Sequence, residues 1–198
     1  GKAIHIALNA PEFSVDWNQV KDAITDKTRM VIVNTPHNPT GAIWSRQDWL
    51  NLIELIQVKN VVVLSDEVYE HLIYDGAKHI SALTFPELRD RCFVVGSFGK
   101  TFHVTGWKTG YCIASPELMK VFRQIYQFAN CCVVTPVQMA LASYMQQHPE
   151  HIDGLSSFYQ QKRDLFLSGL EGSKFSLIPS QGTFFQNVDY SAIRPDLS

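Results

Sequence analysis

The sequence predicts an α/β fold in which a mostly parallel sheet is sandwiched by helices, followed by the start of a smaller α/β domain. Two observations support this prediction. Short apolar runs rich in β-branched residues alternate with amphipathic helical patterns, which is typical of parallel strands covered on both faces. The 198 residues are 45% hydrophobic and 18% charged, which suits a globular chain with a substantial core.

The elements follow from these patterns in chain order. Strands are predicted at residues 3–8, 28–34, 60–66, 91–97 and 108–115, and in a second unit at 174–179 and 183–190. Helices are predicted at residues 15–24, 45–57, 116–128, 136–148 and 149–170. Ser14 or Asp16 is the expected N-cap of the first helix, and Ser45 that of the second. We expect residues 1–160 to be part of a larger domain and residues 161–198 to hold the end of a long helix and the start of a small C-terminal domain.

Several classes of protein are disfavoured by composition. The formal net charge of −2, with no dense run of Lys or Arg, argues against nucleic acid and acidic membranes as partners. No apolar stretch reaches the roughly 18 residues of a membrane span, and the N-terminus shows no signal-peptide pattern and no initiator Met. The four cysteines form no CxxC pair, which favours buried free thiols in a reducing cytoplasm. No two histidines have a metal-binding spacing such as HExxH, so we expect no metal.

Polar side chains follow three of the predicted strands at their carboxyl ends, where open parallel sheets bind ligands. They are Asn38 after the strand at 28–34, Asp66 and Tyr69 after the strand at 60–66, and Ser97 and Lys100 after the strand at 91–97. Each has an ordinary alternative: turn chemistry for Asn38, helix capping for Asp66, core packing for Tyr69. Lys100 could extend along apolar surface to reach water. If the three strands are neighbours, however, all five side chains converge on one edge of the sheet.

Lys100 lies in a setting that favours chemistry with carbonyl groups. The segment VVGSFGKT resembles the end of a phosphate-binding P-loop, but that motif needs a glycine where Val94 stands. A lysine in a dry, positively charged pocket has a lowered pKa and reacts with carbonyls, and Lys108 supplies a second cation nearby. The residue types match the needs of pyridoxal phosphate: an amine, a carboxylate for the ring nitrogen, a phenol and an amide for the 3-oxygen, and a hydroxyl with a cation for the phosphate.

Three segments, NTPHNPTG (34–41), SDEVYEHL (65–72) and SFGKTFHVTGWKTGY (97–111), resemble the fold-type I pyridoxal-phosphate enzymes, in particular the class I and II aminotransferases. GKTFHVTGWKTGY is most similar to the branch that contains methionine, kynurenine and glutamine aminotransferases. The similarity runs through the whole chain and includes QGTFFQNVDYS (181–191). It implies pyridoxal 5′-phosphate as cofactor, amino acid and 2-oxo acid substrates, a homodimer and a cytoplasmic location. The larger domain, 1–160, would then belong to the domain that binds pyridoxal phosphate.

The resemblance also implies a role for each residue. Lys100 would form the Schiff base with the cofactor and then move a proton between the substrate's α-carbon and the cofactor's C4′. Asp66 would pair with the pyridinium nitrogen, and Tyr69 would hydrogen-bond the 3-oxygen. Asn38 would share the 3-oxygen and brace the side of the site where the substrate carboxylate lies.

The phosphate would be bound by Ser97 and Lys108. Many relatives carry arginine at the position of Lys108, and lysine supplies the charge without a bidentate fork.

The chain also departs from the family, whose members are considerably longer. We expect three parts of the family to be absent: an N-terminal arm with a tyrosine for the partner's phosphate, a glycine-rich phosphate loop with its stacking aromatic residue, and the arginine that clamps the substrate carboxylate. Arg194 lies too early to take the last role, so the chain reads as a central fragment.

The predicted function is the pyridoxal-phosphate-dependent transfer of an amino group from an amino acid, with methionine, aromatic amino acids or kynurenine as candidates, to a 2-oxo acid. The alternatives are a C–S β-lyase or synthase of the same fold, a non-catalytic cofactor-binding module, and a truncated inactive domain.

Overall fold

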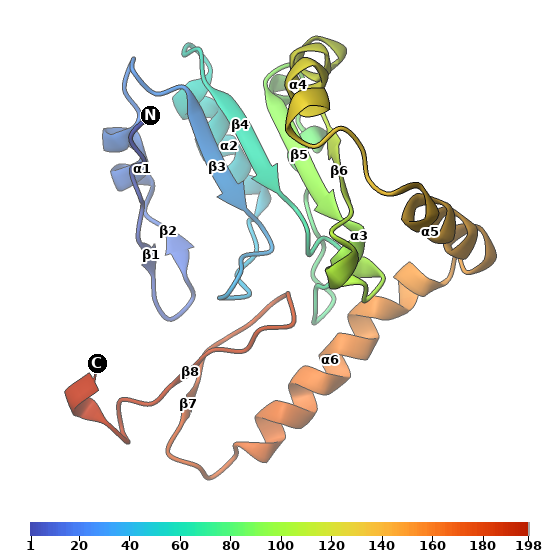
Figure 1. The fold of residues 1–198 in the computed structure, drawn as a ribbon. Coiled ribbons are helices and arrows are strands. Elements are labelled where there is room, and N and C mark those ends of the chain that lie inside the picture. Colours follow the sequence, from blue (N-terminus) through green and yellow to red (C-terminus); the bar gives the residue numbers. More distant parts are fainter. Residues whose placement is uncertain (198) are drawn as a thin grey trace.

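A computed structural model of the chain describes residues 1–197, and its centre is a four-stranded sheet with the order β3-β4-β5-β6 (Figure 1). The strands are β3 (Met30–Asn34), β4 (Val62–Asp66), β5 (Cys92–Ser97) and β6 (Gly110–Ile113). The first three are parallel, and β6 runs antiparallel to β5. The predicted α/β fold with a mostly parallel sheet is therefore confirmed.

The predicted helices are present with small shifts of their ends. They are α1 (Trp17–Ala23), α2 (Arg46–Ile56), α4 (Pro116–Ala129), α5 (Thr135–Gln147) and α6 (His151–Gly169), with a short α3 (Phe98–Thr101) after β5. Short 3-10 turns occur at Ala82–Thr84, Pro86–Leu88, Thr105–Trp107 and Pro195–Leu197. Asp16 caps α1, and Ser45 begins α2 with a capping box. These caps place both helix starts where the sequence predicts them.

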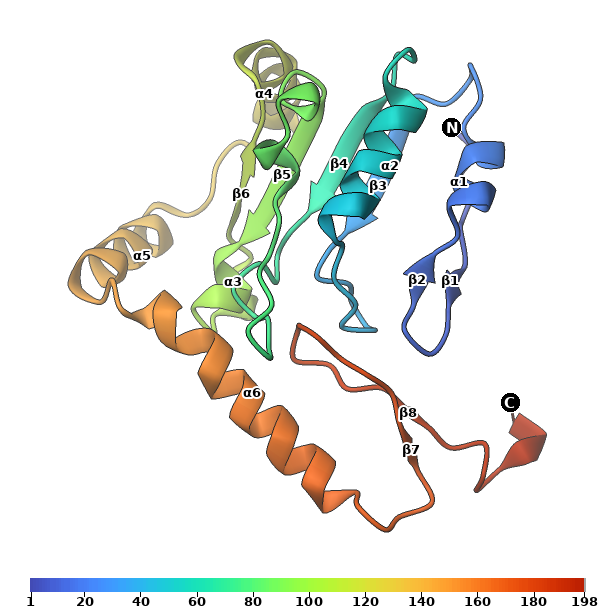
Figure 2. The same ribbon diagram turned by 180° about the vertical axis from the view of Figure 1, so that it is seen from behind.

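Helices flank the sheet on both faces. In Figure 2, α2 lies over one face, where its buried Trp49 and Leu52 pack against Val63 and Val94 of the strands. On the other face α4 packs on β5 through Phe93 and Phe122, whose ring centroids are 6.1 Å apart. The main core therefore lies between α2 and the parallel strands.

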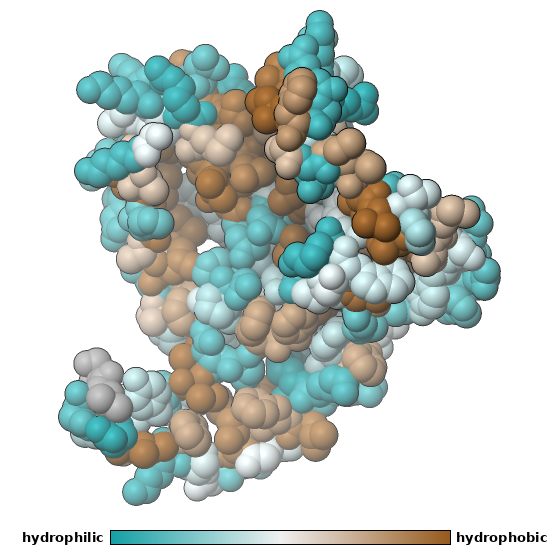
Figure 3. Space-filling model, viewed as in Figure 1, coloured by the Kyte–Doolittle hydropathy of each residue, from teal (hydrophilic) through white to brown (hydrophobic). Residues whose placement is uncertain are grey.

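The coverage of the second face is incomplete over β3, which the sequence had predicted to be a buried strand. Met30 is 48% exposed and Ile32 68% exposed. Figure 3 shows apolar surface on this side of the sheet, between α1 and α4. Residues 1–197 therefore bury the apolar side chains of β3 less completely than the sequence predicts for a buried strand.

Three strand predictions, at residues 3–8, 174–179 and 183–190, are wrong in extent. Residues 3–7 lie outside any ladder and are mostly exposed, and only β1 (Leu8–Asn9) pairs, with β2 (Ser14–Val15). In the second unit, pairing is limited to β7 (Ser176–Leu177) and β8 (Val188–Asp189). An apolar run forms a strand only where a neighbouring strand takes up its hydrogen bonds, and the described residues supply few such partners here.

The remaining expectations concern cysteines and membranes. All four cysteines are free, but only Cys92 is fully buried, and Cys131 and Cys132 are exposed. Among residues 1–197, none of the helices has the length and apolar character needed to cross a membrane.

Candidate functional site

The carboxyl ends of β3, β4 and β5 lie side by side, as the sequence predicts for a site at this edge. Asn34 is paired with Asp66, and Asp66 with Val95, so the three strands end almost level with one another. The segments that follow them carry the candidate side chains (Figure 1). The sequence prediction that these strands are neighbours is therefore confirmed.

Asn34 braces this edge, a role that sequence reasoning missed. Its side-chain amide donates to the Asp66 carbonyl oxygen over 3.1 Å, and its side-chain oxygen accepts from the backbone N–H of Asn38 over 2.8 Å. The backbone N–H of Thr35 also donates to the Asp66 carbonyl oxygen. The loop that carries Asn38 is thereby attached to the end of β4, while the Asn38 residue itself stays exposed. The sequence feature that could have revealed this role is the presence of an asparagine as the last residue of a strand.

Asp66 presents a half-buried carboxylate at the end of β4. Burial raises the pKa of Asp66, the hydrogen bond from the Val68 N–H opposes this rise, and the charge of Glu67 adds to it. The Val68 N–H lies 3.3 Å from the carboxylate. Residues 68–71 form a turn rather than the helix that Asp66 was considered to cap. Among the described residues, Asp66 forms no ion pair, so its carboxylate is available to a positively charged group.

Tyr69 and Lys100 lie next to each other. The Lys100 Nζ is 5.9 Å from the centre of the Tyr69 ring and 5.6 Å from that of Phe184, distances at which an ammonium is attracted to an aromatic face. Burial raises the pKa of Tyr69, and the nearby charge of Asp66 raises it further. Within residues 1–197, no carboxylate forms an ion pair with Lys100. A lysine, a phenol and a carboxylate therefore occupy one small region.

Ser97 and Lys108 lie at the junction of β5 and β6. Ser97 is the last residue of β5 and begins α3, but its hydroxyl does not cap that helix. The register pairs Ser97 with Gly110, two residues after Lys108. Lys108 is exposed and has a φ of 53°, in the left-handed region, which costs a non-glycine residue about 1–2 kcal/mol. Register places this cation near the end of β5, and the structure records no direct contact between the two side chains.

Helix α6 fastens the turn that carries Lys100. The His151 Nε2 donates to the carbonyl oxygen of Thr101 over 2.8 Å, and the Tyr159 hydroxyl lies 3.1 Å from the Nδ1 of His103. Leu155 of the same helix packs on the buried Tyr69 ring. The position of α6 therefore sets the positions of both the lysine and the phenol, which the sequence could not indicate.

A cavity of about 340 Å³ opens between α6 and the segment that precedes β8. Tyr159 and Arg163 line it from α6, and Phe184 and Gln186 line it from the other side. Because Phe184 also contacts Lys100, this cavity borders the candidate site on the side of the hairpin.

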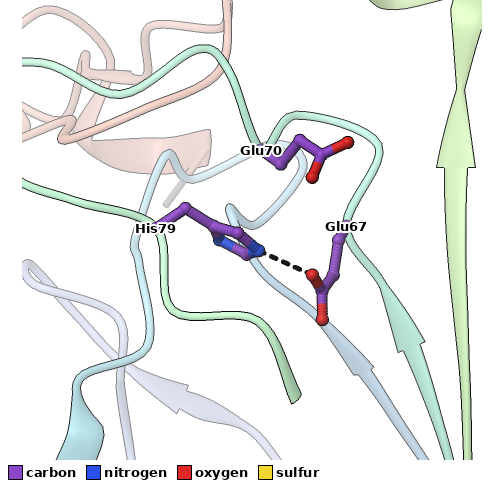
Figure 4. A group of neighbouring side chains, drawn as sticks. All are labelled: Glu67, Glu70 and His79. Atoms are coloured by element: carbon purple, nitrogen blue, oxygen red, sulfur yellow. Dashed lines mark hydrogen bonds and ion pairs between the residues drawn. The ribbon is translucent and has the colours of Figure 1, made fainter. Parts of the chain in front are cut away.

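A second polar group lies behind the end of β4 (Figure 4). Glu67, Glu70 and His79 each offer a ligand atom within 4.8 Å of the others. The His79 Nε2 lies 2.7 Å from the Glu67 carboxylate and donates to it, so these two side chains are hydrogen-bonded to each other. Sequence reasoning did not single out any of the three residues.

Comparison with known protein families gives a single consistent picture. The model of the family described as aminotransferase class I and II matches residues 1–196. The methionine aminotransferase of Escherichia coli K12 is 43% identical over 188 residues, which cover 95% of this chain and 49% of that protein. The human kynurenine–oxoglutarate transaminase 3 is 34% identical over 197 residues, which cover 96% of this chain and 43% of that protein.

Comparison with solved structures also finds aminotransferases. An Escherichia coli structure for which a methionine aminotransferase function was identified superposes with a TM-score of 0.91 at 43% identity, over 94% of this chain and 49% of that one. The N-succinyldiaminopimelate aminotransferase of Mycobacterium tuberculosis superposes with a TM-score of 0.88 at 32% identity, over 94% of this chain and 49% of that one. The chain thus spans about half the length of the relatives it matches.

Proposed function

Because this chain belongs to the class I and II aminotransferase family, we propose that it forms the part of an aminotransferase that holds pyridoxal 5′-phosphate. The proposed reaction is the transfer of an amino group from an amino acid to a 2-oxo acid. The observation that carries this proposal is the meeting of Asp66, Tyr69 and Lys100 at the carboxyl ends of neighbouring parallel strands. Their positions match the complementary needs of one cofactor.

The residues fit pyridoxal phosphate by the chemistry of their free groups. Lys100 has no acidic partner among the described residues, Asp66 has no cationic one, and the Ser97 hydroxyl is not used in capping. Bound there, pyridoxal phosphate would supply an aldehyde carbon that reacts with amines and a ring that accepts electrons. Lys100 would hold the cofactor through its amine, and Asp66 would accept a hydrogen bond from the protonated ring nitrogen.

The other residues orient the cofactor and move a proton. Tyr69 and Asn38 would donate hydrogen bonds to the 3-oxygen of the ring. Ser97 and Lys108 would bind the phosphate group, the former by hydrogen bonding and the latter by charge. The amine of Lys100 would also serve as the group that moves a proton between the substrate α-carbon and the cofactor's C4′.

The names of the relatives support a narrower proposal. Methionine and kynurenine aminotransferases are among them, so methionine, kynurenine and aromatic amino acids are the proposed amino donors. The Escherichia coli, human and Mycobacterium tuberculosis relatives are all aminotransferases or transaminases, which favours amino transfer over elimination by a C–S lyase. By the same resemblance we infer a cytoplasmic homodimer in which residues 1–160 belong to the cofactor-binding domain and residues 161–198 begin the smaller one.

The test is covalent labelling of the purified chain. Pyridoxal phosphate is added, the mixture is reduced with borohydride, and the modified lysine is mapped by mass spectrometry. We expect a phosphopyridoxyl group on Lys100 that disappears in Lys100→Ala. Lys120→Ala is the matched control, because Lys120 is an exposed lysine of α4 with no proposed role.

Two results would count against the proposal. Labelling scattered over surface lysines, or unchanged in Lys100→Ala, would show that the chain forms no specific site around this residue. If Lys100 is labelled, a matched 2-oxo acid product would support amino transfer, whereas pyruvate with ammonia would favour the lyase.

A further inference from the structure

Glu67 is the most deeply buried acid next to the candidate site. It directly follows Asp66 and is only 1% exposed. A buried carboxylate is costly unless it is paired and hydrogen-bonded. Burial alone would raise the pKa of Glu67, but the hydrogen bonds and charge it receives, those of His79 foremost, lower it below its usual value. Glu67 therefore remains charged in the interior, because its hydrogen-bond partners stabilise the carboxylate.

Those partners come from two segments, the end of β4 and residues 79–82. The carboxylate accepts hydrogen bonds from the Ser65 hydroxyl over 2.8 Å, the His79 Nε2 over 2.7 Å and the Ala82 N–H over 3.0 Å. Figure 4 shows the side chains of Glu67 and His79 directed toward each other just beyond the end of β4. The Glu67 backbone N–H also donates to the Val95 carbonyl oxygen of β5. This residue thus links the end of β4 to β5 and to residues 79–82.

The linked segment is itself rigidly held. The indole N–H of Trp49, a fully buried residue of α2, donates to the Ile80 carbonyl oxygen over 2.9 Å. Ala82 is also fully buried in the main core. Glu67 is therefore anchored to the main core, whereas within residues 1–197 the Asp66 side chain accepts one hydrogen bond, from the Val68 N–H.

Neighbouring side chains in extended backbone leave in opposite directions. Fixing the Glu67 side chain in the interior therefore directs the Asp66 side chain toward the opposite side, where Tyr69 and Lys100 lie. We propose that Glu67 is a positioning residue, which holds the end of β4 through Ser65, His79 and Ala82 so that the Asp66 carboxylate faces the cofactor. This inference rests on the proposed function, because it takes Asp66 as the contact to the ring nitrogen.

The first readout of the test needs no cofactor. Hydrogen exchange of the Val68 amide, measured by NMR on the 198-residue chain, reports whether the Asp66 carboxylate stays in place. In Glu67→Ala we expect Val68 to lose protection on the order of tenfold, as removing a supporting partner typically weakens a site. The Val63 amide, which donates to the Arg91 carbonyl oxygen within the sheet, should be unchanged and serves as the internal control for folding.

Variants then separate geometry from charge. Glu67→Gln keeps the length of the side chain and an oxygen that accepts from Ser65 and Ala82, but its NH2 group cannot accept from the His79 Nε2. It should therefore restore most of the protection of Val68, to the level expected of His79→Ala. Glu54→Ala is the control, because it removes an exposed acidic side chain of α2, and it should leave Val68 unchanged. If Glu67→Ala exposes Val63 as well and so does not fold, the milder His79→Ala, which removes one of the three anchors, is read in its place with a smaller expected loss.

The second readout is the affinity for pyridoxal phosphate, measured by absorbance titration. We expect it to fall on the order of tenfold in Glu67→Ala and to recover in Glu67→Gln. Unchanged Val68 exchange in a folded Glu67→Ala, or no recovery in Glu67→Gln, would overturn the positioning role. If the unmodified chain does not bind pyridoxal phosphate while Val68 still responds, the proposed function falls and the positioning of Asp66 stands.

Discussion

Replacing Gly41 by alanine tests how the Asn38 loop is held against the rest of the molecule. Gly41 has a φ of +73°, and its carbonyl oxygen accepts from the Gln181 N–H over 3.0 Å. An added Cβ would lie 2.1 Å from the Ser180 Oγ and 2.7 Å from the Gly182 carbonyl oxygen. The Ser180 hydroxyl is already bonded to the Gly182 carbonyl oxygen, so it cannot move aside without breaking that bond. The loop and residues 180–182 must therefore separate.

The size of the effect follows from two contributions to the free energy of unfolding. The left-handed backbone costs alanine about 1–2 kcal/mol, and forcing a methyl group into packed atoms costs about 1–3 kcal/mol. We therefore expect Gly41→Ala to lose about 2–5 kcal/mol of stability in urea denaturation. Gly76→Ala is the matched control, because Gly76 has a φ of +72° but no atom within 4 Å of its added Cβ. Gly76→Ala should lose only the stability that the left-handed backbone costs alanine. Equal losses of unfolding free energy in the two variants would refute the packing argument.

Three further predictions concern the core, the hairpin and pH. Trp49→Ala should cost about 3–5 kcal/mol of unfolding free energy in urea denaturation, because this fully buried ring also loses a hydrogen bond. Arg163→Lys should lower the melting temperature slightly, corresponding to about 0.5–1 kcal/mol, since lysine cannot form the bidentate pair with the largely exposed Asp75. Burial would raise the pKa of Glu67, but the hydrogen bonds that its carboxylate accepts and the charge of His79 lower that pKa in the folded chain. Its stabilising effect is therefore present above pH 4.5, the unfolded value, and lost as the pH falls through the folded value. Urea denaturation across this range should show a smaller loss of stability on acidification in Glu67→Gln than in the unmodified chain, and parallel curves would contradict this assignment.

Local sequence signals located most elements of the fold. The β-branched runs ending at Asn34, Asp66 and Ser97 became adjacent parallel strands, because such runs need burial on both faces and a parallel sheet provides it. Ser45 began its helix as predicted, since a cap depends on residues within one turn. Residues 3–7 failed as a strand because strand formation depends on a partner that local sequence does not reveal.

The residues of the candidate site were likewise predicted only in part. Asn38, Asp66, Tyr69, Ser97, Lys100 and Lys108 were identified from residue type and from their positions after strands, and their individual roles stay predictions. The supports were not visible in the sequence. Asn34 bonds across 32 positions to the Asp66 carbonyl oxygen, and His151 bonds across 50 positions to Thr101. No periodicity or motif relates residues so far apart.

By itself, the sequence determined the order of strands and helices, the edge of the sheet where polar groups gather, and the family resemblance. These depend on local periodicity and on short motifs whose residues are close together in the chain. Only the tertiary structure decided that Lys100 lies beside the Tyr69 and Phe184 rings, which contact each other, and that Glu67 is buried against His79 behind Asp66. Those contacts join segments far apart in the chain, and their geometry is set when α6 and residues 79–82 pack against the ends of the strands.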